Sequence, residues 1–288
     1  MSFVERSYAM QAADESKMGL PSLYTAPETI DCWRHSRMLA GCKPLVEALP
    51  QAKWMTVGDG RYGSDAAYLS ALGADVMATS LTDEKLREGY SLGFLKKYRI
   101  ENAEALSCAD AAYDFVLCKE AYHHLPRPPV ALYEMLRVAS TAVVLIEPCD
   151  NPKLLDAAKR WIKRMLRGDK VFDYEPGGNY LYRLNLKELG QLMCAIGNHT
   201  IAVRGINDFY HPKFASALAG GRNLPFMLTR IGVSVQNLLA RAGLLGYGLC
   251  CVVVFNGTPA VALLQALRKS GFDIIELPKN PYLASTQP

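Results

Sequence analysis

Glycines that directly follow an apolar stretch give the clearest chemical signal in this sequence. The stretch Trp54-Met55-Thr56-Val57 leads into Gly58-Asp59-Gly60-Arg61-Tyr62-Gly63. A strand that runs into a glycine turn and then a helix lets backbone N–H groups approach a ligand without interference from Cβ atoms. The pattern therefore predicts a turn that binds a nucleoside-containing cofactor. Its predicted cofactor contacts are Gly58, Asp59, Gly60 and Gly63.

Polar or small residues also follow the next predicted strands. Ser80 ends the strand at 76–79, Asn102 and Ala103 follow the strand at 98–100, and Lys119 follows the strand at 115–118. The carboxyl ends of parallel strands form one crevice, so these four residues are further predicted cofactor contacts. A ribose-binding carboxylate is expected where Ser80 stands, and a serine hydrogen bond in its place could weaken binding by about 1 kcal/mol or more.

Side chains that could move a proton gather just after the fourth strand. They are Glu120, Tyr122, His123 and His124. A base placed there could remove the proton of an incoming nucleophile. The two histidines could equally brace the loop, and Glu120 could simply pair with Lys119. Three residues of a later segment could also reach the site: Asp208, Tyr210 and His211.

Strands alternate with helices along most of the chain, which predicts an α/β fold with a doubly wound, Rossmann-like and mostly parallel sheet. Further strands are expected at 143–146, 201–203, 249–255 and 273–277. Helices are expected at 64–72, 82–97, 129–139, 151–170, 185–197 and 259–269, and Ser80 and Asp83 have a capping-box spacing. Near-continuous β-branched runs such as Val143–Ile146 indicate strands that are covered on both faces.

Four segments are expected on this basis. Residues 1–53 form an N-terminal helical cap, and residues 54–150 form the cofactor-binding core. Residues 151–240 form a helical insertion or lid with a core helix and strand at about 185–205. Residues 241–288 complete the sheet.

The order of motifs in residues 50–150 resembles the class I S-adenosylmethionine-dependent methyltransferases. The motifs are Val-Gly-Asp-Gly-Arg-Tyr-Gly, Glu-Asn-Ala-Glu-Ala-Leu, Tyr-Asp-Phe-Val and His-His-Leu-Pro-Arg-Pro. The resemblance implies a seven-stranded sheet with its last strand antiparallel and S-adenosylmethionine as the cofactor. It implies methionine at the glycine turn, ribose at Ser80, adenine at Asn102 and Ala103, and the sulfonium beside 119–122. In this chain, Asp59 could instead face the methionine ammonium.

The same resemblance suggests the acceptor. The sequence of residues 118–128 is similar to that of methyltransferases of bacterial polysaccharide and natural-product pathways. This resemblance implies methylation of a small molecule, at a hydroxyl of a saccharide or another biosynthetic intermediate. Two alternatives stay open. One is a non-catalytic methyltransferase-like binding module, motivated by Ser80; the other is a nicotinamide-dependent oxidoreductase, since the glycine spacing also suits a dinucleotide.

The composition of the chain limits the classes of partner that we expect. The 288 residues carry a net charge of only +4, too little to predict nucleic-acid binding. The eight cysteines form no CxxC pair and several lie in apolar runs, so we expect buried free thiols in a reducing, cytoplasmic environment. No signal peptide, integral membrane span or metal-ligand spacing is evident. The partner is then a small-molecule acceptor, with a homo-oligomer left open.

Two later segments have more than one interpretation. The basic amphipathic helix at 151–170 is either a solvated face, a dock for a phosphate-bearing acceptor, or a contact with an anionic membrane surface. Tyr180, Tyr182 and Arg183 form either a lid over the acceptor or interfacial packing.

Overall fold

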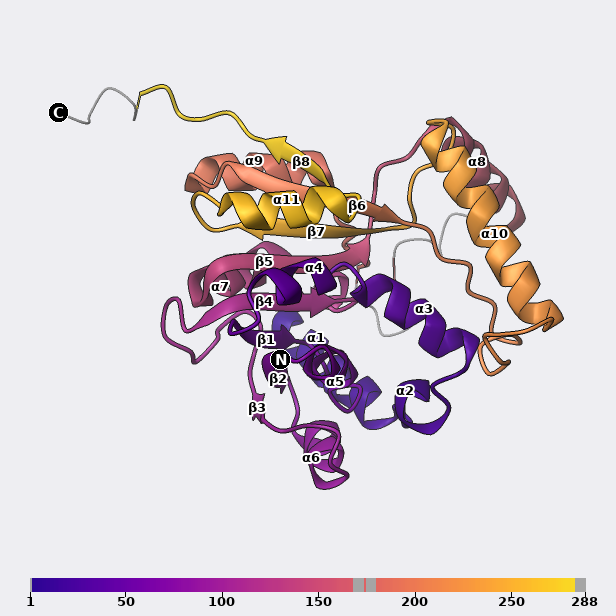
Figure 1. Ribbon diagram of the computed structural model, residues 1–288, viewed down its shortest axis with the longest axis horizontal. Helices are drawn as coiled ribbons and strands as arrows, with labels where there is room; N and C mark the ends of the chain where they lie inside the picture. Colours follow the sequence, from indigo (N-terminus) through magenta and orange to yellow (C-terminus); the bar gives the residue numbers. More distant parts are fainter. Residues whose placement is uncertain (1, 168–173, 175–179, 283–288) are drawn as a thin grey trace.

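A central eight-stranded sheet organises the chain. The computed structural model describes residues 2–167, 174 and 180–282 (Figure 1). The strands are β1 (Lys53–Val57), β2 (Asp75–Ser80), β3 (Tyr98–Ile100), β4 (Tyr113–Lys119), β5 (Ala139–Pro148), β6 (Thr200–Ile206), β7 (Leu249–Phe255) and β8 (Asp273–Glu276). Their order across the sheet is β3-β2-β1-β4-β5-β7-β6-β8. Strands β1 to β5 pair in parallel, β7 runs antiparallel to β5 and β6, and β8 runs antiparallel to β6.

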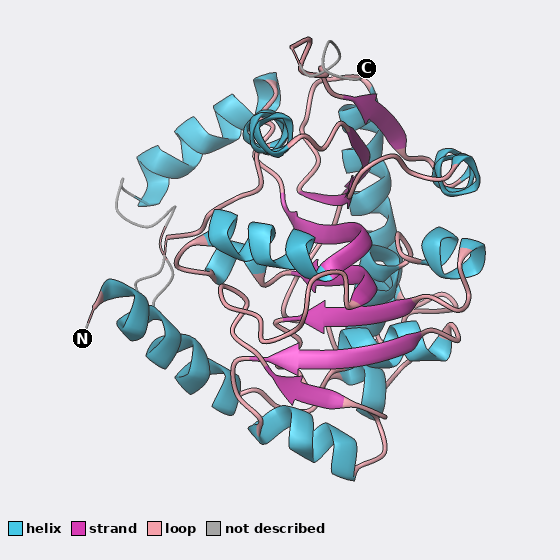
Figure 2. Cartoon of the chain, turned by 90° about the vertical axis from the view of Figure 1, so that its left-hand side faces the viewer, coloured by secondary structure: helices cyan, strands magenta, loops and turns pink. Residues whose placement is uncertain are grey.

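Helices cover both faces of this sheet (Figure 2). They are α1 (Phe3–Ser16), α2 (Ser22–Thr25), α3 (Ile30–Leu39), α4 (Lys43–Ala48), α5 (Ser64–Ala71), α6 (Glu84–Ser91), α7 (Pro128–Val138), α8 (Leu154–Arg167), α9 (Leu186–Ile196), α10 (Leu224–Arg241) and α11 (Val261–Lys269), with a 3₁₀ turn η1 (Tyr122–His124). One apolar core lies between the sheet and α3, α4, α5, α6 and α11. A second core lies on the other face, under α7 and α9.

Strand β7 shows why its sequence is apolar throughout. Its side chains alternate between the two cores, so that Cys251, Val253 and Phe255 enter one and Cys250, Val252 and Val254 enter the other. All seven residues are buried. A strand that is covered on both faces needs apolar residues at every position, as the sequence predicts. The eight cysteines are free thiols, six of them buried.

The sheet contains one strand more than the resemblance implied. The antiparallel strand of the seven-stranded pattern is β7, and β8 is a four-residue addition on the outer edge of β6. The sequence signal at 273–277 is this edge strand. None of the helices that the structure describes is both long and apolar enough to cross a membrane.

Two local expectations were wrong. The helix expected at 82–97 ends at Ser91, because Gly93 follows in the left-handed region with φ of +78° and turns the chain. The capping box expected at Ser80 does not form: Asp83 is the N-cap of α6 and has no side-chain cap bond, while the Ser80 hydroxyl binds elsewhere. Of the helix expected at 151–170, residues 168–170 lie outside the described part of the chain.

Candidate active site

A cavity of about 920 Å³ opens at the carboxyl ends of the parallel strands. Its walls come from the segments that follow β1, β2, β3 and β4, and from α1. Figure 2 shows α1, which begins at the N-terminus, running across the end of the sheet to which the arrowheads of the parallel strands point. The volume falls within the range of ligand pockets in proteins. The loops that the sequence placed at one crevice therefore do line one cavity.

The glycine turn lines this cavity, and an added Cβ at Gly58, Gly60 or Gly63 would lie within 3 Å of a neighbouring atom. Gly58 has φ of +73°, and a Cβ there would lie 2.5 Å from the Cβ of Ala121. A Cβ on Gly60 would lie 2.4 Å from Cδ of Glu15. The turn thus has the close backbone approach that the sequence predicts. Gly63 adopts φ of +69° and leads directly into α5.

Asp59 holds the turn against the start of α5. Its carboxylate accepts hydrogen bonds from the Thr56 hydroxyl at 2.9 Å and from the backbone N–H groups of Asp65 and Ala66 at 3.2 and 2.9 Å. Burial and the nearby charge of Asp65 raise the pKa of Asp59 to about 8. These three bonds give Asp59 a structural role in the turn, and Asp59 also lines the cavity, so the ammonium contact considered from the sequence stays a prediction.

Ser80 meets a carboxylate that comes from the far N-terminus. Its hydroxyl donates to Glu15 at 2.8 Å, and the Thr82 hydroxyl donates to the other Glu15 oxygen at 2.6 Å. Glu15 lies at the end of α1 and is only 7% exposed. Burial raises the pKa of its carboxyl above the usual value, although both hydroxyls and Lys85 act in the opposite direction. The end of β2 therefore carries a carboxylate after all, supplied from 65 residues away.

The loop after β3 is rigidly held. The Asn102 side-chain oxygen accepts from the Glu104 N–H at 2.9 Å. The buried Glu104 carboxylate accepts in turn from the backbone N–H and the Nε of Arg127, at 2.7 and 2.6 Å. Both Asn102 and Ala103 line the cavity. This loop can present a backbone edge and an amide to a planar base.

Lys119 and Glu120 lie at the end of β4, opposite the glycine turn. Lys119 Nζ is 3.1 Å from Asp65 and 3.6 Å from Glu120. Burial opposes the charged form of Lys119, but the two carboxylates raise its pKa above the ordinary value. Glu120 has φ of +49°, a left-handed conformation that is costly for a residue with a side chain. Both residues line the cavity.

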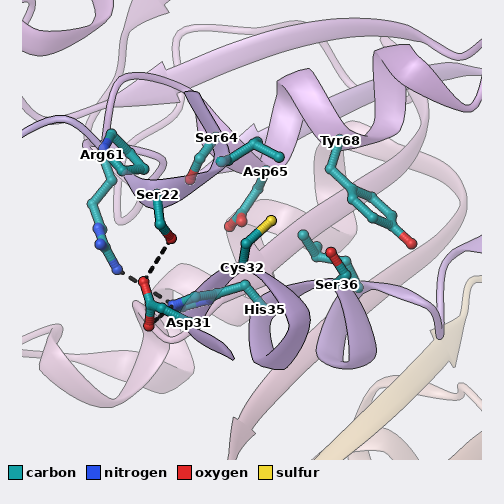
Figure 3. A pocket seen from close by; sticks show the side chains of 12 residues that line it. Ser22, Asp31, Cys32, His35, Ser36, Arg61, Ser64, Asp65 and Tyr68 are labelled. Carbon is teal, nitrogen blue, oxygen red and sulfur yellow. Dashed lines mark hydrogen bonds and ion pairs between the residues drawn. The ribbon is translucent and has the colours of Figure 1, made fainter. Parts of the chain in front are cut away.

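A histidine that the sequence did not single out joins this group. His35 of α3 lies with Nδ1 3.8 Å from Glu120 and Nε2 3.7 Å from Asp31. Figure 3 shows His35 and Arg61 directed toward Asp31 in a recess beside the glycine turn, and Arg61 approaches the His35 ring to 3.5 Å. Burial and the Lys119 charge lower the pKa of His35 below its usual value, against the opposing effect of Glu120 and Asp31. A neutral imidazole here can accept a proton.

The two histidines proposed from the sequence are bound differently. His123 Nδ1 is 2.5 Å from the fully buried Glu147, whose carboxylate also accepts from the backbone N–H groups of Ala121 and Tyr122 at 3.0 Å. The ring of His124 lies 3.9 Å from that of His123. Both histidines line the cavity, but these contacts are those of a braced loop.

Tyr122 does not reach the cavity. Its side chain is 1% exposed and packs in the second core, with its ring against that of Tyr182. Burial raises the pKa of Tyr122 far above the usual tyrosine value, so its hydroxyl is not a base near neutral pH. The 3₁₀ turn η1 places Tyr122 in the core and His123 and His124 at the cavity, which the linear sequence did not indicate.

The other candidates take structural contacts. Asp208 forms a bidentate ion pair with Arg34 of α3, and Tyr210 stacks on the same guanidinium. His211 packs on Phe214. In the predicted lid, the Tyr182 hydroxyl donates to Glu188, while Tyr180 and Arg183 are exposed. Residues 173 and 175–179 of that segment lie outside the described chain. Among the described residues, no group of three or more His, Cys, Asp or Glu could hold a metal ion.

Comparison with known proteins identifies a methyltransferase domain in part of the chain. A family model described as a methyltransferase domain matches residues 55–146, which include the glycine turn, the end of β2, the loop after β3 and the end of β4. Residues 55–146 form a methyltransferase domain. No curated protein sequence matches the chain.

Solved structures agree with the methyltransferase fold. Magnesium protoporphyrin IX methyltransferase from Synechocystis PCC 6803, which contains bound S-adenosylhomocysteine, aligns with a TM-score of 0.50 and 12% identity over 85% of this chain and 93% of that chain. A chain from the complex that contains the Haloferax volcanii Trm112 methyltransferase activator aligns with a TM-score of 0.50 and 14% identity, over 90% of this chain and 100% of that chain.

The methyltransferase cofactor is S-adenosylmethionine, and the residues present suit it. Gly58 and Gly60 line the cavity with bare backbone, and an added Cβ would collide with Ala121 at the first and meet the Glu15 side chain at the second. A buried carboxylate, Glu15, stands at the end of β2, where ribose hydroxyls need an acceptor, and the loop at Asn102 and Ala103 lines the same cavity. These matches favour an adenosyl sulfonium over the nicotinamide cofactor that the glycine spacing alone allowed.

Proposed function

We propose that this methyltransferase transfers a methyl group to a hydroxyl of a small-molecule acceptor. One observation carries the proposal: His35, Glu120 and Lys119 gather beside the glycine turn, where Glu120 and Lys119 line the cavity and His35, whose pKa is lowered, lines the recess next to it. A hydroxyl nucleophile benefits from a base that is unprotonated near neutral pH. A saccharide or a related biosynthetic intermediate is the acceptor class that we favour.

Cofactor contacts are assigned residue by residue. Gly58, Gly60 and Gly63 would receive the methionine portion with their backbone, and Asn102 with the Ala103 N–H would bind adenine. Glu15 would accept the ribose hydroxyls, oriented by Ser80 and Thr82, which already donate to it. Lys119, held by Asp65, would lie near the carboxylate of the methionine portion. Asp59 supports the turn from behind.

The chemistry then needs little more than alignment. S-adenosylmethionine supplies an electrophilic methyl group on a positively charged sulfur. The cavity residues would hold the acceptor oxygen in line with that methyl, so that the O–C bond would form as the S–C bond breaks and S-adenosylhomocysteine leaves, and this alignment can supply much of the rate acceleration. His35 accepts the hydroxyl proton at a ring nitrogen, and Glu120 stabilises the imidazolium that forms, across 3.8 Å. His123 and its buried partner Glu147 keep the loop after β4 in position.

A non-catalytic binding module is the second candidate. Its motivation was the absence of an acid at Ser80, and Glu15 removes that motivation because it delivers a carboxylate to the same point. If the cofactor binds but none of a broad panel of hydroxylated and aminated small molecules is methylated, the result would favour a non-catalytic binding module.

Titration calorimetry tests the cofactor assignment directly. We expect S-adenosylmethionine and S-adenosylhomocysteine to bind with micromolar affinity, and NADH to give no heat. A protein that bound NADH and neither adenosyl ligand would overturn the proposal. Mass spectrometry of the acceptor panel after incubation with methyl-labelled cofactor then identifies the methylated atom.

Changing His35 to glutamine is expected to alter the pH profile of methyl transfer. The pKa of His35 is lowered from the usual histidine value of about 6.5, so the His35 ring is unprotonated at that pH and above. The kcat/KM of the wild type should therefore fall only as the pH drops below about 6.5. We expect the variant to lose about 100-fold in kcat, a typical general-base contribution, and to lose this acidic limb. Its affinity for S-adenosylhomocysteine should not change. An unaltered acidic limb in the variant would assign the proton transfer to another group.

A further inference from the structure

Helix α8 exposes a row of large apolar side chains. Leu154, Trp161, Ile162 and Met165 are 74%, 64%, 50% and 68% exposed. Their spacing of seven, eight and eleven residues places them on one face of the helix. Soluble monomeric proteins rarely expose a contiguous apolar surface of this kind unless it binds something. This face of α8 is therefore the first part of a candidate docking surface.

Helix α10 exposes a second apolar row. Its inner side is anchored, because Thr229 is fully buried and Phe226 packs edge-on against Trp33 of α3. Its outer side carries six exposed apolar residues at helical spacing: Leu224, Met227, Leu228, Ile231, Val235 and Leu238. Helix α10 is thus apolar on the side that packs and on the side that does not.

The two helices belong to one end of the molecule. The Leu155 N–H donates to the Leu244 carbonyl at 3.0 Å, and the Gly246 N–H donates to the Asp156 carboxylate at 2.7 Å, so the start of α8 is joined to the segment after α10. Figure 1 shows both helices at the same end, away from the sheet. We call α8 and α10 together the helical lobe.

Positive charge is concentrated in the same lobe. In sequence, α8 (Leu154–Arg167) contains five Lys or Arg and one Asp, and α10 (Leu224–Arg241) contains two Arg and no acid. The whole chain has a net charge of only +4, so the rest of the protein is net negative. Arg222, Arg230 and Arg241 are exposed around α10. A strong amphipathic helix with tryptophan on its apolar face and many cations is typical of a segment that lies in a lipid interface.

We propose that the helical lobe docks on an anionic membrane surface. The apolar rows of α8 and α10 would enter the boundary between head groups and acyl chains, and the surrounding cations would meet lipid phosphates. This inference does not depend on the identity of the methyl acceptor. An anionic lipid surface attracts the positive lobe. A second copy of this chain would bring two strongly positive lobes together, which like-charge repulsion disfavours.

Vesicle flotation with the full chain tests the proposal. We expect the protein to float with vesicles of phosphatidylcholine and phosphatidylglycerol and to remain behind with phosphatidylcholine alone. Binding should fall in about 0.5 M salt, where charges are screened within a few ångströms. Tryptophan emission should shift to the blue on binding, and Trp161→Phe should remove that shift, because Trp54 is already buried and Trp33 packs on Phe226, on the inner side of α10.

A matched pair of variants separates docking from general stickiness. Trp161→Ser combined with Ile162→Ser should weaken vesicle partitioning by about tenfold or more, because two large side chains no longer enter the lipid. Val261→Ser on α11, where Val261 is 68% exposed, should not change partitioning. Both should retain wild-type affinity for S-adenosylhomocysteine, which shows that the fold is intact.

Three outcomes would overturn the proposal. Equal flotation with neutral vesicles would remove the role of charge, and no flotation with either would remove the membrane altogether. A concentration-dependent dimer in analytical ultracentrifugation that the double variant abolishes would assign the apolar rows to a second copy of the chain.

Discussion

Replacing Gly58 with arginine is expected to abolish binding of S-adenosylhomocysteine, with an affinity loss of more than about 100-fold, or more than about 2.7 kcal/mol. The reason is geometric. A Cβ at Gly58 would lie 2.5 Å from the Cβ of Ala121, so any side chain must displace the loop after β4 or extend into the cavity. Titration calorimetry measures the loss.

Gly73→Arg is the matched control for this variant. Gly73 also has a positive φ, of +96°, but no atom lies within 4 Å of its Cβ position, and it is the turn between α5 and β2. Gly73→Arg should lose about 1–2 kcal/mol of unfolding free energy, because a side chain in the left-handed region is strained, and Gly58→Arg should lose more, because its Cβ also collides with Ala121. Only Gly58→Arg should lose the cofactor. Equal affinity in the two variants would show that the glycine turn does not contact it.

Replacing Glu15 with glutamine is expected to weaken S-adenosylhomocysteine binding by roughly ten- to 100-fold. A hydrogen bond to a charged group contributes about 1.5–3 kcal/mol, and glutamine removes the charge while keeping the shape. For the 2′-deoxy analogue of S-adenosylhomocysteine, the same substitution should reduce affinity much less. The analogue already lacks one of the two hydroxyls from which the carboxylate would accept a hydrogen bond. If Glu15→Gln reduced the affinity for intact S-adenosylhomocysteine less than the affinity for the 2′-deoxy analogue, Glu15 would not contact the ribose.

The Glu15 prediction has a control and a rescue. Glu47→Gln on α4 changes an acid that does not line the cavity, whose side chain is 64% exposed and pairs with Lys43, and it should leave affinity unchanged. Glu15→Ala combined with Ser80→Asp should recover binding, because the carboxylate then comes from β2 itself. If Glu15→Gln instead tightened binding, Glu15 would be a plug that competes with the cofactor.

Protonation provides a further check on Glu15. Its pKa is raised by burial, so the folded chain holds this proton at a higher pH than the unfolded chain does. By linkage, the Glu15 carboxylate does not stabilise the ligand-free protein near neutral pH. The unfolding temperature of ligand-free Glu15→Gln should therefore equal or exceed that of the wild type, while its cofactor affinity falls. A merely structural role for Glu15 would lower both together.

Sequence alone determined the parts of this protein that depend on local pattern. The apolar run before Gly58, the glycine turn and the loop at Asn102 and Ala103 each lie in a short segment, and strand period together with topology brings them to one edge of the sheet. The all-apolar stretch at Leu249–Phe255 likewise specified a strand covered on both faces. The alternating order of strands and helices indicated the fold.

Contacts between distant segments determine which side chains complete the site. Glu15 reaches Ser80 from 65 residues away, and His35 reaches Glu120 from another helix. Tyr122 and His123 are adjacent in sequence, yet Tyr122 packs in the core while His123 lines the cavity and binds Glu147. The hydrophobic periodicity of the sequence does not predict such contacts, because they arise from the packing of α1 and α3 against the sheet and from the turn after β4. Local patterns fix what an element is, whereas long-range packing fixes which side chains meet.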